Sequence, residues 1–400
     1  MSSISPQSME TVKATVPFLQ ENALPLTKHF YQRMFTENPE VKPYFNMAHQ
    51  VSGSQQAALA GAVCAFAENI ETPQNLAQAV ELIGNKHASL GVKPEHYPIV
   101  GKHLLGAIDD LLAPAPPEIL EAWSEAYGFL ADVLIKREQQ LYDNMPWTGF
   151  KDFRVIEIKQ ESDVIRSFHL KAADGSPAPD FKPGQYVTVR LPDGNGSTTM
   201  RNYSLSCHGC SEKLRISVKR ESPHHADQPQ GYASNYLHDT INVGDTIELA
   251  SPCGEFFLEP SQNQGPILLL SGGIGVTPML AMLHATAGKS YPVTFLQGAI
   301  NAANHAFKEE IAAIAKQHDN ITTHIRYSAP MAGDVADSTG LFDKEFLQNF
   351  LTPETEVFFC GPKPMMAHVL GALDTLGHPK RQIHYEFFGP AEELRQCPLH

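Results

Sequence analysis

Two motifs in the second half of the chain have residue types suited to binding phosphate. The first is a glycine turn, Ser271-Gly272-Gly273-Ile274-Gly275-Val276-Thr277-Pro278-Met279, which follows the apolar run 266–270. Glycines permit positive φ and a close approach of the backbone to a dinucleotide, and the apolar run predicts a parallel strand buried on both faces. We expect Thr277 to cap the next helix and Pro278 to take its first position. Strand, turn and helix together predict a Rossmann-like dinucleotide site.

The second motif is Arg201-Asn202-Tyr203-Ser204, which follows Pro183-Gly184-Gln185-Tyr186 and precedes Gly231-Tyr232-Ala233-Ser234-Asn235-Tyr236-Leu237. These segments match the flavin-binding pattern of the ferredoxin reductase superfamily. The resemblance implies that FAD is bound by Tyr186, Arg201, Asn202, Tyr203 and Ser204. An arginine can hold the pyrophosphate by two hydrogen bonds, and a tyrosine can stack on the isoalloxazine. Ser234 is expected to cap a helix whose N-terminal amides face the pyrophosphate, the alternative being a plain helix cap.

The same resemblance assigns residues to the nicotinamide side. Cys360-Gly361-Pro362 lies at the carboxyl end of a predicted strand, where open α/β sheets bind ligands, although Cys360 can also be an ordinary buried thiol. Tyr385-Glu386-Phe387-Phe388-Gly389-Pro390 is similar to a terminal flavin-contacting segment. The implied cofactor contacts are Gly273, Ile274, Gly275, Val276, Thr277, Pro278, Cys360, Gly361, Pro362, Phe387, Phe388, Gly389 and Pro390. The tail Ala391–His400 has no interpretation.

The choice between NADH and NADPH depends on a cation for the 2′-phosphate. Residues 297–306, which follow the second predicted strand of this region, contain neither Arg nor Lys. The sequence therefore favours NADH as the donor.

His87 is the residue of the first half whose position points to chemistry. It follows Ile83 by four residues and Val80 by seven, so its ring is expected to project with the buried stripe of a helix. An isolated buried histidine is more often held by a backbone carbonyl than bound to a metal. Gln55 and Leu59 share a helix face, and Phe45 ends a proline-bounded turn. An aromatic corner, a polar residue and a later histidine resemble a globin that holds haem.

The resemblance extends over essentially the whole chain to the bacterial flavohaemoglobins. It rests on these local matches: Thr11-Val12-Lys13-Ala14-Thr15, His29-Phe30-Tyr31-Gln32-Arg33-Met34-Phe35, Asn38-Pro39-Glu40, Phe45-Asn46-Met47, Lys86-His87 and Ala122-Trp123. The resemblance implies that His87 is the iron ligand, with Glu138 behind its ring and Tyr97 nearby. A carboxylate in that place fixes the imidazole tautomer and increases electron donation to iron.

On the opposite side of the haem, the resemblance implies that Tyr31 donates to bound oxygen. Gln55 would be a second polar group there, Phe45 the aromatic corner and Leu59 the steric cover. Tyr31 as an ordinary core tyrosine is the alternative. Lys86 would influence the haem potential, and a solvated lysine on a helix face is an equal alternative.

The implied activity is that of an NAD(P)H-dependent nitric oxide dioxygenase. Electrons would pass from NADH or NADPH through FAD to haem b, and nitric oxide and oxygen would become nitrate. The alternative within enzymes is a general haem reductase of oxygen or of hydroperoxides, including those of lipids. A gas sensor is a third interpretation, although the chain has no output domain, DNA-binding segment or coiled coil.

Three domains must position these residues. Apolar residues recur at helical spacing in the first 145 residues, as in Leu24, Phe30, Met34 and Phe35, then Leu59, Val63 and Phe66, then Leu76, Val80 and Ile83. Strand-like alternation begins near Phe153. We predict an all-α globin domain over 1–145, an antiparallel β-barrel FAD domain over 150–260 and a doubly wound, Rossmann-like α/β NAD(P) domain over 265–400.

The composition of the chain limits the classes of binding partner that we expect. The 44 acidic and 30 basic residues give a net charge of −14, which disfavours nucleic acid or an anionic membrane surface. No apolar run approaches the length of a membrane span, and the polar N-terminus resembles no signal peptide, so we expect a cytoplasmic monomer with small-molecule substrates. Cys207-His208-Gly209-Cys210 with His224 and His225 has zinc-ligand residue types, but no second C-x-x-C follows, and a turn is favoured.

Overall fold

The computed structural model describes residues 3–46, 50, 53–209, 212–222, 231–263 and 265–389. The chain forms two compact units. One contains Met1–Gly149 with Pro192–Met200, and the other contains Phe150–Leu191 with Arg201–His400. Pro390, the tail Ala391–His400, Met47, Cys210, His224 and His225 lie outside the described residues.

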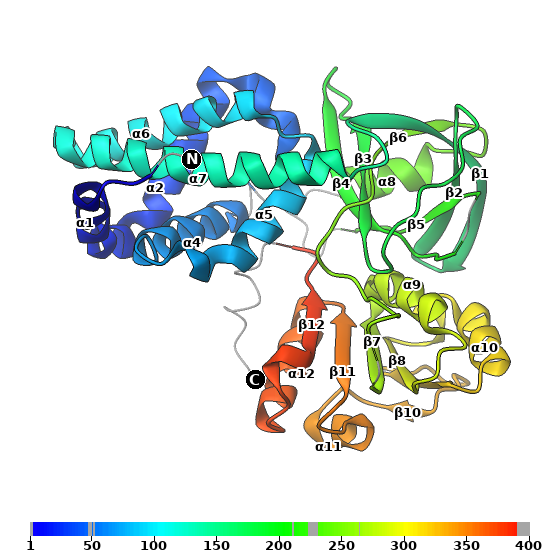
Figure 1. Ribbon diagram of the computed structural model, residues 1–400. Helices are drawn as coiled ribbons and strands as arrows, with labels where there is room; N and C mark the ends of the chain where they lie inside the picture. The colour runs from blue at the N-terminus through cyan, green and yellow to red at the C-terminus, as the bar shows by residue number, and fades with distance from the viewer. Residues whose placement is uncertain are drawn as a thin grey trace. The chain divides into compact units, whose positions relative to one another are not determined.

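The first 143 residues of the chain, within the described ranges, form helices, as predicted (Figure 1). Prolines stand in the first turn of several of its helices, where a missing N–H costs no hydrogen bond. Its core contains Phe30, Met34, Trp123 and Ala126, whereas Leu24 is 41% exposed because the buried face of its helix runs through Leu19, Ala23 and Leu26. The helices are α1 (Pro6–Ala14), α2 (Val16–Glu37), α4 (Ser54–Glu68), α5 (Ala77–Leu90), α6 (Tyr97–Leu112) and α7 (Pro117–Asp143), with 3-10 turns η1 (Pro39–Tyr44), η2 (Pro73–Leu76) and η3 (Pro94–His96).

Residues 150–250 contain a six-stranded sheet of order β4-β3-β6-β1-β2-β5. Pairing of β1 with β2 and β6, of β2 with β5 and of β3 with β6 is antiparallel. Beyond the end of β4, Leu205 bridges to Ile216 of β5, so the first and last strands meet and the sheet curls into a barrel. The strands are β1 (Phe150–Ser162), β2 (Ile165–Ala172), β3 (Tyr186–Pro192), β4 (Thr198–Ser204), β5 (Leu214–Lys219) and β6 (Thr246–Ala250), with helix α8 (Tyr232–Asp239).

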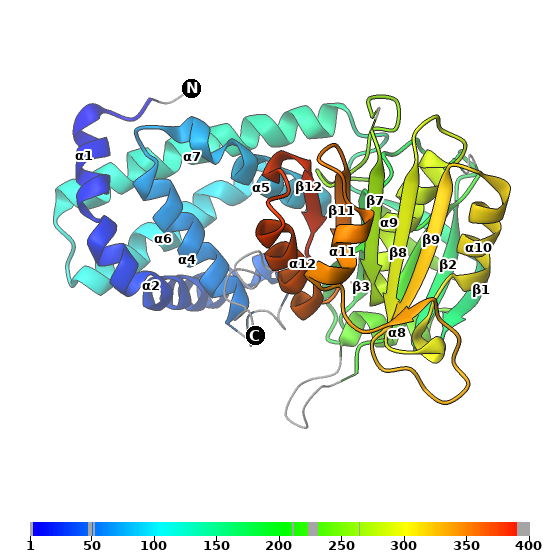
Figure 2. The same cartoon turned by 90° about the horizontal axis from the view of Figure 1, so that it is seen from below.

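A second six-stranded sheet follows, with order β10-β9-β8-β7-β11-β12 and parallel pairing throughout (Figure 2). Its central strand β7 is buried at every residue, as the apolar run predicts. Ile267 and Leu269 pack against one layer of helices, and Leu268 and Leu270 against another, which is the doubly wound arrangement. The strands are β7 (Ile267–Gly272), β8 (Val293–Ala299), β9 (Ile321–Tyr327), β10 (Ser338–Thr339), β11 (Glu356–Cys360) and β12 (Ile383–Glu386).

The helices of this part are α9 (Val276–Thr286) and α10 (Lys308–Gln317) on one face of the sheet, and α11 (Lys344–Leu347) and α12 (Lys363–Thr375) on the other. Short 3-10 turns are η4 (Gly273–Gly275), η5 (Ala302–Asn304), η6 (Gln348–Phe350) and η7 (Lys380–Gln382). Within the described ranges, no helix combines the length and the apolar character needed to cross a membrane.

Two predicted helix caps are wrong. The glycine turn itself continues into α9, so Gly275 is the N-cap, Thr277 is the second helical residue and Pro278 the third. Thr277 Oγ1 donates to the Ile274 carbonyl at 2.9 Å instead of capping. Gly231 caps α8, and Ser234 lies inside the helix, where its hydroxyl donates to the Gly231 carbonyl at 3.0 Å.

Candidate functional site

His87 lies near the end of α5, and one nitrogen of its ring is hydrogen-bonded to a carboxylate. Nδ1 of His87 lies 2.8 Å from Oε1 of Glu138 on α7, which is almost fully buried. The His87 side chain is 33% exposed, so it is less buried than the helix periodicity predicts. A buried carboxylate accepts the Nδ1 proton, which leaves Nε2 as the nitrogen able to bind a metal.

Tyr97, the first residue of α6, completes this cluster. Its hydroxyl donates to Oε1 of Glu138 and lies 3.1 Å from Nδ1 of His87. Burial raises the pKa of Tyr97, and the hydrogen bond to Glu138 raises it further, so the phenol stays protonated as a donor. The sequence-predicted trio of His87, Tyr97 and Glu138 is therefore one hydrogen-bonded cluster drawn from three helices.

A further set of contacts holds the helices of this cluster. Arg137, beside Glu138 on α7, forms two hydrogen bonds with Glu81 of α5, at 2.7 and 2.6 Å. Tyr142 donates to the Val92 carbonyl at 2.6 Å, just beyond the end of α5, and Tyr127 donates to the Tyr97 carbonyl at 2.7 Å. Sequence reasoning missed all these contacts, because each joins residues far apart in the chain.

Tyr31 lies in an aromatic cluster on α2. Its ring stacks on Phe35 with centroids 5.6 Å apart and meets the edge of Phe45 at 5.7 Å. Burial raises the pKa of Tyr31, and a hydrogen bond with Gln50 offsets only part of that rise. The hydroxyl is therefore a proton-bearing donor at neutral pH.

Gln50 is a residue that sequence reasoning missed. Its side-chain amide donates to Oε1 of Gln55 at 2.9 Å, and its own Oε1 accepts from Gln56 at 2.8 Å. Gln50 thus links Tyr31 to Gln55 on α4. Leu59, four residues after Gln55, packs against the helical core. Lys86 is exposed on the surface of α5.

The predicted flavin motif lies on β4, with Tyr186 buried at the start of β3. Oδ1 of Asn202 accepts from Thr188 at 2.8 Å, which ties β4 to β3. Burial lowers the pKa of Arg201 and raises the pKa of Tyr203. Within the described part of the chain, the buried hydroxyl of Ser204 has no hydrogen-bond partner. Such an orphaned group fits a bound ligand with a hydrogen-bonding atom.

Tertiary structure brings together the glycine turn and the Cys360-Gly361-Pro362 segment. Cys360 on β11 pairs with Ser271 on β7, so both motifs begin at the carboxyl ends of adjacent parallel strands. A Cβ atom on Gly275 would lie 2.2 Å from the Cys360 carbonyl, so only glycine fits there. Burial raises the pKa of Cys360, which keeps its thiol protonated. This cradle of backbone at a sheet edge fits a dinucleotide.

The last described residues follow β12. Phe387 packs against the core between the α/β sheet and helices α11 and α12, and Phe388 is 45% exposed. Gly389 ends the described range, and Pro390 of the predicted contact segment lies outside it. The exposed Phe388 therefore lies just beyond the carboxyl end of β12.

Three families match successive parts of the chain. Globin matches residues 28–134, the oxidoreductase FAD-binding domain matches 152–258 and the oxidoreductase NAD-binding domain matches 269–370. The globin match includes His87 and Tyr97 and ends before Glu138. The FAD-binding match includes β4, and the NAD-binding match includes the glycine turn and Cys360-Gly361-Pro362.

Two relatives match nearly the full chain, and a third matches its reductase part. A flavohemoprotein of Rhodopirellula baltica is 47% identical, covering 98% of this chain and 99% of its own length. The structure of a flavohemoglobin from Malassezia yamatoensis, with bound FAD and haem, covers 96% of this chain and all of its own, at 27% identity and a TM-score of 0.86. The FAD- and NAD-binding domain of a nitric oxide dioxygenase from Vibrio cholerae covers 60% of this chain and 99% of its own, at 36% identity and a TM-score of 0.55.

Proposed function

This chain belongs to the flavohaemoprotein family, and from that premise we propose that it is an NAD(P)H-dependent nitric oxide dioxygenase. The overall reaction converts nitric oxide and oxygen to nitrate. The observation that carries the proposal is the His87–Glu138 hydrogen bond, found in a globin that shares one chain with a flavin- and nicotinamide-binding reductase. The nitric oxide dioxygenase name of the Vibrio cholerae relative supports the same reaction.

Three cofactors follow from the matched families: haem b, FAD and NADH or NADPH. When bound, they supply two-electron oxidation of the nicotinamide, division of the electron pair by the flavin and gas chemistry at iron. His87 would hold the haem iron through Nε2. Tyr186, Arg201, Asn202, Tyr203 and Ser204 would bind FAD, and the glycine turn with Cys360-Gly361-Pro362 would bind the nicotinamide cofactor.

Glu138 would act by increasing the basicity of His87. A carboxylate that accepts the Nδ1 proton gives the imidazole partial imidazolate character, and the buried site strengthens that effect. Tyr97 donates to the same oxygen and so holds the carboxylate in one orientation. A strongly donating histidine favours reaction of oxygen over its reversible storage.

Tyr31 would orient the bound gas. Its raised pKa keeps the hydroxyl protonated, and the aromatic rings of Phe35 and Phe45 fix the direction of the phenol. Gln50 and Gln55 extend this polar group, so a small ligand meets a donor in otherwise apolar surroundings. The side chain of Leu59 would limit the space available to that ligand.

The experiment is nitric oxide consumption at an electrode, with purified protein loaded with haem and FAD. We expect rapid loss that requires both oxygen and NADH and yields nitrate. Slow or oxygen-independent loss beside brisk NADH oxidation would contradict the proposal and support a general reductase. Absence of consumption with intact gas binding would support a sensor.

A further inference from the structure

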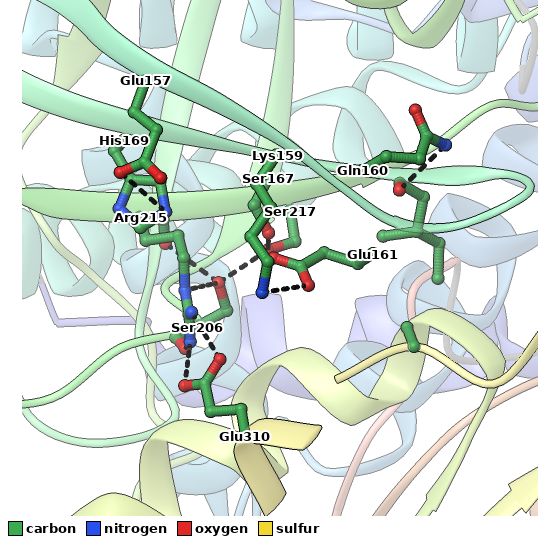
Figure 3. A network of polar contacts seen from close by, with 12 residues as sticks. Glu157, Lys159, Gln160, Glu161, Ser167, His169, Ser206, Arg215, Ser217 and Glu310 are labelled. Atoms are coloured by element: carbon green, nitrogen blue, oxygen red, sulfur yellow. Dashed lines mark hydrogen bonds and ion pairs between the residues drawn. The ribbon is translucent and has the colours of Figure 1, made fainter. Parts of the chain in front are cut away.

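A largely buried ion pair joins the flavin-binding barrel to the nicotinamide-binding sheet inside the second unit (Figure 3). Arg215 on β5 donates to Glu310 on α10 through two parallel hydrogen bonds, Nη1 to Oε2 at 2.8 Å and Nη2 to Oε1 at 2.9 Å. Their side chains are 7% and 21% exposed. Arg215 falls in the range matched by the FAD-binding family and Glu310 in that matched by the NAD-binding family.

On the barrel side, Arg215 is bonded to the chain that carries the flavin motif. Nη2 donates to the carbonyl of Ser206, and Nε donates to its hydroxyl at 3.1 Å. Ser206 lies two residues after Ser204, the end of the Arg201–Ser204 motif. The Ser206 hydroxyl is hydrogen-bonded to the Ser217 hydroxyl at 2.7 Å, and that hydroxyl is hydrogen-bonded to Ser167 at 2.8 Å. The contact of Arg215 with Ser206 is therefore part of a hydrogen-bond chain inside the barrel.

On the opposite side, Glu310 is bonded to the helix that leaves the glycine turn. Nε2 of His284 on α9 lies 2.7 Å from Oε1 of Glu310. Burial alone would raise the pKa of Glu310, but the hydrogen bonds from His284 and Arg215 outweigh it and lower the pKa to about 2. Glu310 is therefore charged at neutral pH, and it connects α9 and α10 to Arg215.

An ion pair of this kind contributes more to the relative orientation of its two partners than to the free energy of unfolding. Two buried charges lose much hydration, so replacing a buried ion pair by apolar residues often leaves stability unchanged. A bidentate arginine–carboxylate pair does fix both distance and direction between its partners. Apolar packing between the two parts, such as that of Ile165 on β2 with residues of α9 and α10, is non-directional.

We propose that Arg215 and Glu310 are positioning residues for hydride transfer, which hold the nicotinamide-binding sheet in one orientation against the flavin motif. This inference rests on the reductase part of the proposed function, and the gas reaction does not enter it. The transfer moves one hydride, with its two electrons, from the reduced nicotinamide to the flavin, which also takes one proton from solvent. An error of about 1 Å in such a step can cost on the order of a hundredfold in rate.

The test is anaerobic stopped-flow reduction of FAD by NADH in the full-length holoprotein, which yields a limiting rate and an NADH affinity. We expect Arg215→Met and Glu310→Gln to lower the limiting rate at least about tenfold, with FAD content and NADH affinity nearly unchanged. The double variant Arg215→Met/Glu310→Met should keep a Tm near that of the wild type yet remain slow. Glu248→Gln is the matched control, since Glu248 pairs with Arg190 inside the barrel alone.

A double variant that reduces its flavin at the wild-type rate would overturn the proposal. So would an equal slowing in Glu248→Gln, because a general loss of rigidity would then explain the effect. If the wild type accepts no hydride from NADH, the reductase part of the proposed function itself fails. Normal reduction in the wild type without nitric oxide consumption would contradict only the dioxygenase reaction and leave the positioning role supported.

Discussion

Oε1 of Glu138 lies 2.8 Å from Nδ1 of His87, although 51 residues separate them in the chain. The carboxylate is buried, and Tyr97 donates to the same oxygen. In the proposed function, this hydrogen bond is how Glu138 influences the electron donation of His87.

Glu138→Gln should lower nitric oxide consumption by about tenfold to a hundredfold, because a neutral amide draws less electron density into the His87 ring. The iron–histidine stretching frequency in the resonance Raman spectrum should fall in the same variant. Glu121→Gln, at an exposed position on the same helix, is the control. An unchanged frequency would mean that Glu138 does not tune His87.

Tyr31→Phe should slow nitrate formation by about tenfold to a hundredfold, the effect expected for losing one hydrogen bond to a polarised ligand. FAD reduction by NADH should keep its rate, because Tyr31 belongs to the helical unit alone. Both steps are measured on one preparation. A parallel fall of both rates would show that the assigned role is wrong.

Gly275→Ala should destabilise the protein by about 1 to 3 kcal/mol and weaken NADH binding, because its methyl group would collide with the Cys360 carbonyl. Gly128→Ala is the control: it lies within α7, and among the described residues a Cβ atom added to Gly128 would meet no neighbour within 4 Å. Urea unfolding and NADH titration measure the two effects. Equal stability of both variants would contradict the close approach.

NADH should be preferred over NADPH by about tenfold or more in kcat/KM, an energy difference of about 1.4 kcal/mol. The reason is that residues 297–306, which comprise the end of β8 and the segment that follows it, contain no Arg or Lys to bind the 2′-phosphate. Steady-state kinetics with both donors and the holoprotein decide the point. Equal kcat/KM values would show that the phosphate is met by a cation elsewhere.

The stabilising effect of Glu310 should depend on pH. Its pKa in the folded protein is lowered to about 2 from an ordinary value of 4.5, so its charged form is favoured by folding. That contribution is fully present above pH 4.5 and is lost as the pH falls from 4.5 toward 2. The Tm difference between wild type and Glu310→Gln should therefore shrink across this window. A difference that stays constant would mean that Glu310 is not charged in the folded protein.

Local sequence determined the elements and the motifs that they carry. Helical spacing predicted α2, α4 and α5, and the apolar run before the glycines predicted β7, because side-chain periodicity follows directly from helix and strand geometry. The resemblance to flavohaemoglobins supplied Glu138 and Tyr97. The predicted caps at Thr277 and Ser234 are wrong, because the preceding glycines already adopt the cap positions.

Only the tertiary structure decided which distant groups meet. Gln50 beside Tyr31, Arg137 with Glu81, and Arg215 with Glu310 across 95 residues leave no periodic signal in the sequence. The closeness of Gly275 to Cys360 likewise depends on β7 and β11 being neighbours in the sheet. Such contacts depend on strand order and helix packing, which bring together residues that no local pattern relates. The sequence thus determined the helices, the strands and the classes of cofactor that their motifs bind. The fold decided which distant side chains contact the residues of those motifs.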